Sequence, residues 1–293
     1  MQAEETLDSQ TIVLGEAMRH YRAFQVPGID VLCDQWLFST AKQAQSAAHQ
    51  MGINQVTSEL YGVTNWDFDF RGHKQQGDWQ AALGITHRVH HLALASLGGE
   101  AKRDYPASIF YQSPWYNQYK VVEDYFARIN TALRTGDPIE RIAVIHPIES
   151  YWLLYGPKEQ TSERRQKMEE QFDQITHWLL CGALDFDFIS EGLMRGFDTD
   201  ADEKGLQVGK MSYDSVVVPG CLTLRGTTMN LLEKFRAAGG KVLFVGDIPT
   251  MVDAVESDRP QLLAQKAECV EFSRLKITVT VPNGFWNQRA VAE

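Results

Sequence analysis

The stretch VTSELYG, residues Val56–Gly62, decides the fold of the first part of the chain. It is rich in β-branched and aromatic residues and ends in glycine, which predicts a strand. A short apolar run precedes it at Ile29–Asp34, and Ile85–Leu94 follows it; both also predict strands. The segments between them, Ala41–Met51 and Gly77–Leu83, have the composition of helices. Strands that alternate with helices indicate a parallel sheet with helical crossovers.

The rest of the chain alternates in the same way after a break at Gly136-Asp137-Pro138. Most predicted strands after this break are followed by a helix, which predicts a doubly wound α/β domain. We therefore expect one domain over residues 1–135 and a second over residues 136–293. The other expected elements are helices at Thr6–Gln25, Val121–Arg134, Glu163–Leu180, Thr227–Ala238 and Asp258–Glu268, strands at Arg141–His146, Phe186–Ile189, Tyr213–Val218, Lys241–Val245 and Ile277–Val281, and a mobile acidic loop at Phe197–Gly205.

The composition argues against several classes of protein. Lys and Arg total 28 while Asp and Glu total 38, and this net charge of −10 without a basic cluster argues against nucleic-acid binding. No apolar run approaches the ~20 residues that span a bilayer, and acidic residues within the first ten argue against a secretion signal. The four cysteines form no Cys-x-x-Cys pair, so we expect reduced, mostly buried thiols in a cytoplasmic protein. No nucleotide-binding glycine motif follows a strand, and no cofactor is predicted.

The candidate site is centred on Glu59, which lies late in the central predicted strand. The carboxyl ends of parallel strands meet at one edge of a sheet, where functional residues gather. Asp34 ends the preceding strand, and His91 lies near the end of the following one. Trp66 and Asp67 lie on the loop after Glu59. Carboxylates accept hydrogen bonds from sugar hydroxyls and aromatic faces stack on sugar C–H groups, so this combination predicts a carbohydrate substrate.

Glycoside hydrolysis uses two carboxyl groups, ~5–5.5 Å apart for retention of configuration or ~6.5–9.5 Å apart for inversion. We predict Glu59 and Asp34 as the catalytic carboxyl groups. The side chains predicted to bind the substrate are Tyr61, Trp66, Asp67, His87, His91 and Arg103.

Three alternatives stay open at this point. Glu59 could be a buried carboxylate paired with Arg71, Arg88 or Arg103, and the aromatic-rich stretch Tyr61–Tyr125 could be a core belt under a long loop. The closely spaced histidines between positions 87 and 91 give only a weak metal signal, and no metal site is predicted.

A nucleophilic cysteine is the third alternative. Cys221 follows a predicted strand and Pro219-Gly220, and His146 and Glu149 could complete a set with it. However, the Gly-x-Ser-x-Gly pattern of a nucleophile elbow is absent, and the residues after Cys221 read as a loop rather than the start of a helix.

Several runs of sequence resemble the end of a (β/α)8 barrel in large multidomain glycoside hydrolases. Among these enzymes, the runs are most similar to the α-L-rhamnosidase group and its uncharacterised relatives. They are Ser58–Gly62, Trp66-Asp67, Gly77–Gln80 before Leu83–Ile85, Lys102–Ser108 and Tyr111–Trp115. The resemblance implies that Glu59 matches the catalytic carboxylate after the seventh barrel strand. It also implies that Arg141–Phe272 is a flavodoxin-like or glutamine-amidotransferase-like domain, which aids oligomerisation in such enzymes and makes a homo-oligomer an expected partner.

A whole barrel has eight strands over ~250 residues, and only three predicted strands precede the break. The resemblance therefore implies an α/β chain with the last strands of a barrel, lacking the strand that carries the partner carboxylate: a fragment, a truncated product or a divergent relative. Its half barrel is expected to expose open edges and an apolar inner face. The predicted function is glycoside hydrolysis, similar to that of α-L-rhamnosidases. The alternatives are a non-catalytic carbohydrate-binding or oligomerisation module and an amidotransferase-type enzyme that uses Cys221.

Overall fold

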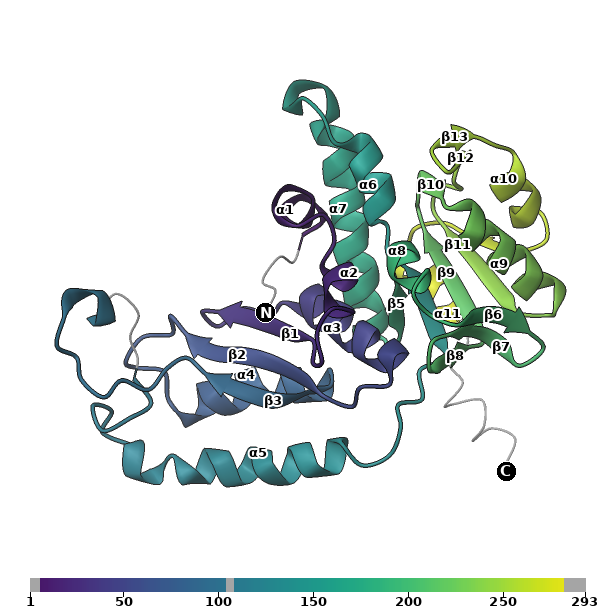
Figure 1. The fold of residues 1–293 in the computed structure, drawn as a ribbon. Coiled ribbons are helices and arrows are strands. Elements are labelled where there is room, and N and C mark those ends of the chain that lie inside the picture. The colour runs from purple at the N-terminus through teal and green to yellow at the C-terminus, as the bar shows by residue number, and fades with distance from the viewer. Residues whose placement is uncertain (1–5, 104–107, 282–293) are drawn as a thin grey trace.

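The computed structural model describes residues 6–103 and 108–281 and shows a mixed α/β protein with two parallel sheets and two smaller sheets (Figure 1). The first parallel sheet has the strand order β1-β2-β3. Its strands are β1 (Gly28–Leu32), β2 (Val56–Gly62) and β3 (Ile85–His90). The three predicted strands and their parallel arrangement are confirmed.

Three helices pack against this sheet: α3 (Phe38–Met51) on β1 and β2, α4 (Phe70–Ala82) on β2 and β3, and α5 (Lys120–Leu133) on α4 and β3. The α3 helix ends at Gly52, whose φ of 73° suits a residue without a Cβ atom. The α4 helix begins well before the predicted Gly77, because the Asp69 carboxylate caps it by accepting the N–H groups of Arg71 and Gly72. Two short 3-10 helices, Glu100–Arg103 and Tyr116–Gln118, lie between β3 and α5.

The predicted helix Thr6–Gln25 is two shorter helices, α1 (Leu7–Val13) and α2 (Ala17–Tyr21). Gly15 separates them with a φ of 83°, a left-handed conformation that interrupts a helix. The α1 helix packs on α6 and α7, and α2 packs on α3 and α8, so the start of the chain contacts both halves of the molecule.

The second parallel sheet has the strand order β14-β11-β9-β4-β5, which is 5-4-3-1-2 when its strands are numbered along the chain. Neighbouring strands are parallel throughout, and most connections contain a helix. The strands are β4 (Ile142–Ile145), β5 (Asp187–Ile189), β9 (Ser215–Pro219), β11 (Lys241–Val245) and β14 (Glu268–Val270), and the helices are α6 (Ile148–Leu154), α7 (Lys158–Cys181), α8 (Glu191–Met194), α9 (Gly226–Ala237), α10 (Arg259–Ala264) and α11 (Arg274–Thr280).

The structure corrects three predictions in this half. The acidic stretch predicted as a mobile loop contains part of an antiparallel sheet of β6 (Thr199–Asp202), β7 (Gly205–Val208) and β8 (Met211–Tyr213). The stretch predicted as a strand at Ile277–Val281 belongs to α11, because Ser273 caps that helix by accepting the N–H of Lys276. The residues after Cys221 form β10 (Thr223–Leu224), which pairs with β12 (Met251–Val252), and β13 (Val255–Glu256) completes that small sheet.

The two parallel sheets share one hydrophobic core, which includes Ile29 of β1 and Val144 of β4. Polar contacts also join α3, which packs on the first sheet, to residues at and just before the start of β5 in the second sheet. The buried Lys42 ammonium of α3 lies 2.7 Å from the Asp185 carboxylate, and His49 lies 2.9 Å from Asp187. The predicted division at residue 135 falls in the connection between α5 and β4 and stays a prediction.

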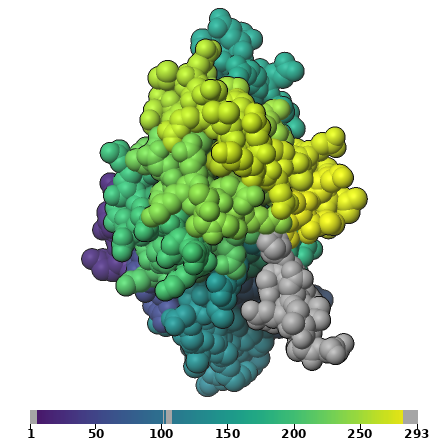
Figure 2. Space-filling model, turned by 90° about the vertical axis from the view of Figure 1, so that its right-hand side faces the viewer, coloured from purple at the N-terminus to yellow at the C-terminus, as the bar shows by residue number. Residues whose placement is uncertain are grey.

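Figure 2 shows that one side of the molecule is formed mainly by the green and yellow C-terminal half of the chain, with the teal region around α5 below it. Within residues 6–103 and 108–281, no helix is both long enough and apolar enough to cross a membrane. All four cysteines are free thiols, and Cys181 and Cys269 are exposed, so the expectation of mostly buried thiols is wrong.

Candidate functional site

Among the helices that the structure describes, those that pack on the β1–β3 sheet leave one of its faces open. Side chains alternate between the two faces of a strand. Ile29, Val56 and Leu60 point toward the helices and are almost fully buried. The residues that alternate to the other side are half-buried or exposed, and we call them the open face: Asp30, Leu32, Thr57, Glu59, His87 and Val89. Four of these six are polar, so the expectation of an apolar inner face is wrong.

Glu59 lies at the centre of the open face. Strand pairing places Asp30 of β1 on one side of it and Val89 of β3 on the other. Paired residues of neighbouring parallel strands point to the same face and lie ~4.8 Å apart across the sheet. The arrangement therefore sets two carboxylates side by side on adjacent strands.

Two of the three arginines in the ion-pair alternative for Glu59 lie in other ion pairs. The Glu59 side chain is 23% exposed, and its carboxylate lies 3.9 Å from the His91 Nε2 atom. Arg71 pairs instead with Asp69, and Arg88 pairs with Glu123. Arg103 ends a 3-10 helix, and its side chain lies outside what the structure describes.

His91 reaches this position because it packs on Gly62. A Cβ atom added at Gly62 would lie 3.2 Å from the His91 ring, closer than most Cβ contacts in proteins. The His91 N–H also donates to the Leu60 carbonyl at 2.9 Å, which holds the backbone after β3 against β2. Glycine at position 62 thus admits the imidazole ring beside the Glu59 carboxylate.

Tyr61 does not lie on the open face. The pairing of β1 with β2 is irregular, because β2 has one more residue than β1 between the pairs Asp30–Glu59 and Leu32–Gly62. Such a bulge redirects a side chain, and the φ of Tyr61 is 71°. The Tyr61 ring is 2% exposed and packs beside His73 of α4. A buried ring cannot form a platform for substrate, so the structure corrects the predicted substrate-binding role of Tyr61.

The covered side of the sheet holds a network of polar and aromatic side chains. The Arg88 guanidinium donates to the Tyr61 hydroxyl at 3.0 Å and to the Glu123 carboxylate at 3.0 Å. Burial raises the pKa of Tyr61 to about 12 and lowers the pKa of His73 to about 4, so both are neutral near pH 7. This part of the aromatic-rich stretch is core, as the alternative expected.

The other predicted residues lie around the open face. His87 accepts or donates a 2.9 Å hydrogen bond with the Thr57 hydroxyl. Trp66 and Asp67 are exposed in the loop after β2, and Trp66 is 42% exposed. Asp34 is exposed in the turn after β1, beyond the residue that pairs with Glu59. The catalytic role of Asp34 and the substrate-binding roles of the other side chains stay predictions.

Asp30 is a residue of the open face that the predicted site does not include. The signal was present, because Asp30 lies between buried Ile29 and Val31 in the same alternation that exposes Glu59. Within the described residues, no group of three or more His, Cys, Asp or Glu side chains is arranged to hold a metal ion.

The cysteine alternative finds no assembled site. Cys221 is 2% exposed, burial raises the pKa of its thiol, and the thiol donates to the Pro219 carbonyl at 3.9 Å. His146 lies 3.5 Å from Glu16. Glu149 pairs with Arg225 through 2.7 Å and 2.9 Å contacts. Cys221, His146 and Glu149 thus each contact other residues and do not form a catalytic set.

A scan against protein-family models finds no match, and a search of curated proteins finds none either. Solved structures do resemble the chain. A rhamnosidase from Novosphingobium sp. PP1Y matches 91% of this chain with a TM-score of 0.59 and 18% identity. A GH42 β-galactosidase from G. stearothermophilus matches 78% with a TM-score of 0.51 and 14% identity, and a β-galactosidase from Rahnella sp. R3 matches 79% with a TM-score of 0.51 and 16% identity.

The chain spans only part of these proteins: 27% of the rhamnosidase and 34% of each β-galactosidase. At this level of identity the likeness concerns the fold. The arrangement of a small parallel sheet followed by a five-stranded one is therefore an arrangement that also occurs in glycoside hydrolases.

Proposed function

We propose that the open face binds carbohydrate and that Glu59 is a catalytic carboxylate for hydrolysis of a glycosidic bond. The observation that supports this most is the position of Glu59, on the central strand of a parallel sheet and on its open face. Its carboxylate is partly accessible and has His91 as a neighbour at 3.9 Å. A carboxylate in that setting can act as an acid, a base or a nucleophile toward a sugar.

A second carboxylate is needed for the usual hydrolytic routes. Asp30 lies directly beside Glu59 in the strand pairing, whereas Asp34 lies beyond the end of β1. We propose Asp30 as the neighbour that tunes or assists Glu59, and we keep Asp34 as the predicted alternative. Comparing Asp30→Asn with Asp34→Asn separates the two, because each change removes one charge and preserves side-chain size.

The proposal also covers the family that the chain resembles and the fold of its two sheets. We propose that β1–β3 correspond to strands of a (β/α)8 barrel in an α-L-rhamnosidase-like protein. We also propose that the second sheet is flavodoxin-like, which its order 2-1-3-4-5 supports. A cytoplasmic location and a homo-oligomer belong to the same proposal.

A non-catalytic carbohydrate-binding module is the second candidate. It is favoured by the position of the predicted partner carboxylate, because Asp34 lies in the turn beyond β1 and does not pair with Glu59. In that case the open face would bind sugar, and Glu59 would contribute hydrogen bonds without bond cleavage.

The test is hydrolysis of p-nitrophenyl glycosides, with α-L-rhamnoside and β-D-galactoside as first substrates. We expect the chain alone to bind sugar weakly and to turn over little. Any turnover should fall by ~10²-fold or more in Glu59→Gln, because general acid–base contributions have that size. Glu163→Gln is the matched control, because it makes the same change at an exposed position on α7, outside the open face. Robust hydrolysis that survives Glu59→Gln would contradict the assignment of Glu59, and sugar binding without any hydrolysis would favour the second candidate.

A further inference from the structure

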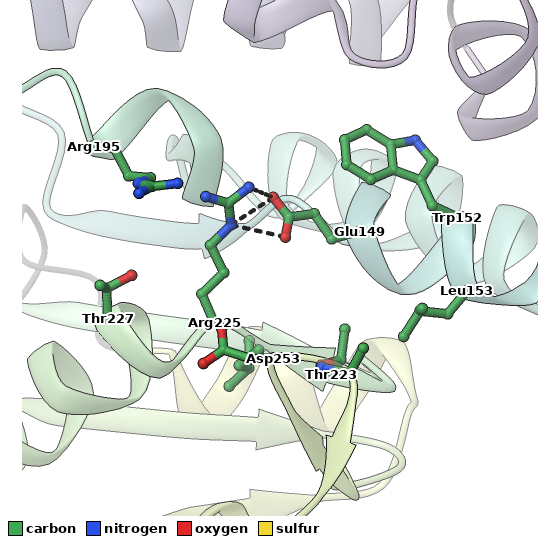
Figure 3. A pocket seen from close by; sticks show the side chains of 10 residues that line it. Glu149, Trp152, Leu153, Arg195, Thr223, Arg225, Thr227 and Asp253 are labelled. Atoms are coloured by element: carbon green, nitrogen blue, oxygen red, sulfur yellow. Dashed lines mark hydrogen bonds and ion pairs between the residues drawn. The ribbon is translucent and has the colours of Figure 1, made fainter.

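A cavity lies at the carboxyl edge of the five-stranded sheet, far along the chain from Glu59 (Figure 3). Its volume is ≈ 450 Å³, which falls in the range of small-molecule sites. Its walls come from the segments that follow four strands: Glu149 after β4, Arg195 after β5, Arg225 and Thr227 after β9, and Asp253 after β11. In open α/β sheets, ligands bind outside the carboxyl ends of the strands where the strand order reverses. The reversal here lies between β4 and β9.

Most of the hydrogen-bond acceptors in this cavity are already engaged by the protein. The Glu149 carboxylate accepts from the Arg225 guanidinium at 2.7 Å and 2.9 Å. It also lies 2.5 Å from the Arg19 guanidinium. The Thr223 hydroxyl accepts the Ala254 N–H at 3.1 Å. Asp253 accepts the Gly226 N–H at 3.0 Å through one carboxylate oxygen. A ligand that brings only donors would therefore meet few free acceptors.

The donors, by contrast, are available. Within the described part of the chain, the exposed Arg195 guanidinium and the Thr227 hydroxyl form no hydrogen bond or ion pair, and the Arg225 Nη1 group donates none. Figure 3 shows Arg195 and Arg225 pointing toward one another, with Thr227 below them. Two guanidinium groups that face each other repel unless an anion lies between them. Guanidinium groups also match the geometry of carboxylate and phosphate oxygens.

We propose that this cavity binds a small anionic ligand, whose carboxylate, sulfate or phosphate group lies between Arg195, Arg225 and Thr227. The rest of the ligand would extend toward Trp152 and Leu153, which form the apolar wall. This site is separate from the open face, and its occupancy does not depend on Glu59 or on glycoside hydrolysis.

The experiment is a titration of the whole chain with sodium phosphate, sodium sulfate and sodium glucuronate, each compared with sodium chloride at the same ionic strength. Binding is measured by calorimetry and by amide shifts in the NMR spectrum. We expect saturable binding of at least one of the three anions, with shifts at Arg225 and Thr227. Binding of phosphate or sulfate alone assigns a tetrahedral group, and binding of glucuronate alone assigns a carboxylate.

Three variants sharpen the test. Arg195→Gln should weaken binding by about tenfold or more, because a hydrogen bond to a charged group is lost. Arg164→Gln is the matched control: it removes the same charge from an exposed position on α7 and should leave the affinity unchanged. Asp253→Asn should tighten binding, since it removes a carboxylate charge from the wall that forms no ion pair with the described residues.

Circular dichroism confirms that each variant is folded, which is expected because all three positions are exposed. The proposal is overturned if the folded wild-type chain binds none of the three anions in a saturable way. It is also overturned if Arg195→Gln and Arg164→Gln reduce the affinity equally, which would indicate unspecific charge attraction.

Discussion

The two parallel sheets of this protein differ in how many faces they bury. In the five-stranded sheet, alternate residues of one strand enter two separate apolar clusters: Val217 of β9 belongs to one cluster, and Val216 and Val218 belong to the other. In the β1–β3 sheet the side toward the helices carries the buried Ile29, Val56 and Leu60, and the other side carries Asp30 and Glu59.

The sequences of the strands express this difference directly. The strand β9 reads SVVVP and β11 reads KVLFV, which are nearly continuous apolar runs. The strand β2 reads VTSELYG, in which polar residues alternate with buried ones. Parallel sheets are normally covered on both faces, so a parallel sheet with an alternating strand has a face that serves something other than the core. The comparison supports the proposal that the open face of the smaller sheet binds carbohydrate, while both faces of the larger sheet contribute to the core.

The largest expected effect concerns the junction between the two sheets. Asp185→Asn should lower the free energy of unfolding by about 3–5 kcal/mol, because the fully buried Lys42 ammonium loses the carboxylate that contacts it at 2.7 Å. Lys42→Met should cost about 1 kcal/mol, since the Asp185 side chain is 40% exposed and remains hydrated. Urea unfolding measures both. Equal costs for the two variants would show that the junction does not depend on this buried charge.

The free energy of unfolding is expected to depend on pH through Glu191, which lies on α8 after β5 of the five-stranded sheet. Glu191 is 4% exposed, and its burial raises the pKa of the carboxyl group to about 7. A raised pKa in the folded state contributes stability that is fully present below about pH 4.5 and is lost as the pH rises through about 7. Between pH 4.5 and pH 8, the wild-type chain should therefore lose about 3 kcal/mol relative to Glu191→Gln. Urea unfolding of both proteins at several pH values gives this difference, and a difference independent of pH would contradict the burial argument.

A matched pair of valines compares the faces themselves. Val217→Thr should lower the free energy of unfolding by about 1–3 kcal/mol, because it places a hydroxyl group in a fully apolar cluster. Val89→Thr makes the same chemical change on the open face, where Val89 is 38% exposed, and should cost less than about 0.5 kcal/mol. Similar losses at the two positions in urea unfolding would mean that the open face is covered as tightly as the core.

The smallest expected effect on stability concerns Glu59→Gln. The change preserves side-chain size and the possibility of a hydrogen bond on a partly exposed face, so the free energy of unfolding should change by less than about 0.5 kcal/mol. Thermal and urea unfolding provide the measurement. A loss of several kcal/mol would give Glu59 a structural role in place of a chemical one.

The strands of the fold could be predicted from sequence because their pattern is local. Runs such as KVLFV and the period-two alternation of VTSELYG are each typical of one environment. The errors lie where a single side chain decides the outcome. Ser273 turns a β-branched segment into a helix by capping it, and the acidic stretch becomes a hairpin because Leu206 and Val208 on β7 are buried.

The site could be predicted only in part, for a similar reason. The position of Glu59 follows from strand alternation, and its open surroundings agree with that reasoning. The bulge that turns Tyr61 into the core depends on a one-residue difference between paired strands, which no local pattern reveals. The cavity between Arg195 and Arg225 was missed because its residues come from segments after four different strands and meet only in the folded sheet.

The most direct test of the central claim is to locate sugar binding on the molecule. We would titrate the isotopically labelled chain with L-rhamnose and D-galactose and map the amide shifts in the NMR spectrum. The account predicts shifts at Glu59, His87 and Val89, with binding weakened in Glu59→Gln and no shifts along β9 or β11. Shifts confined to the five-stranded sheet, or binding that is unchanged in Glu59→Gln, would contradict the assignment of carbohydrate chemistry to the open face.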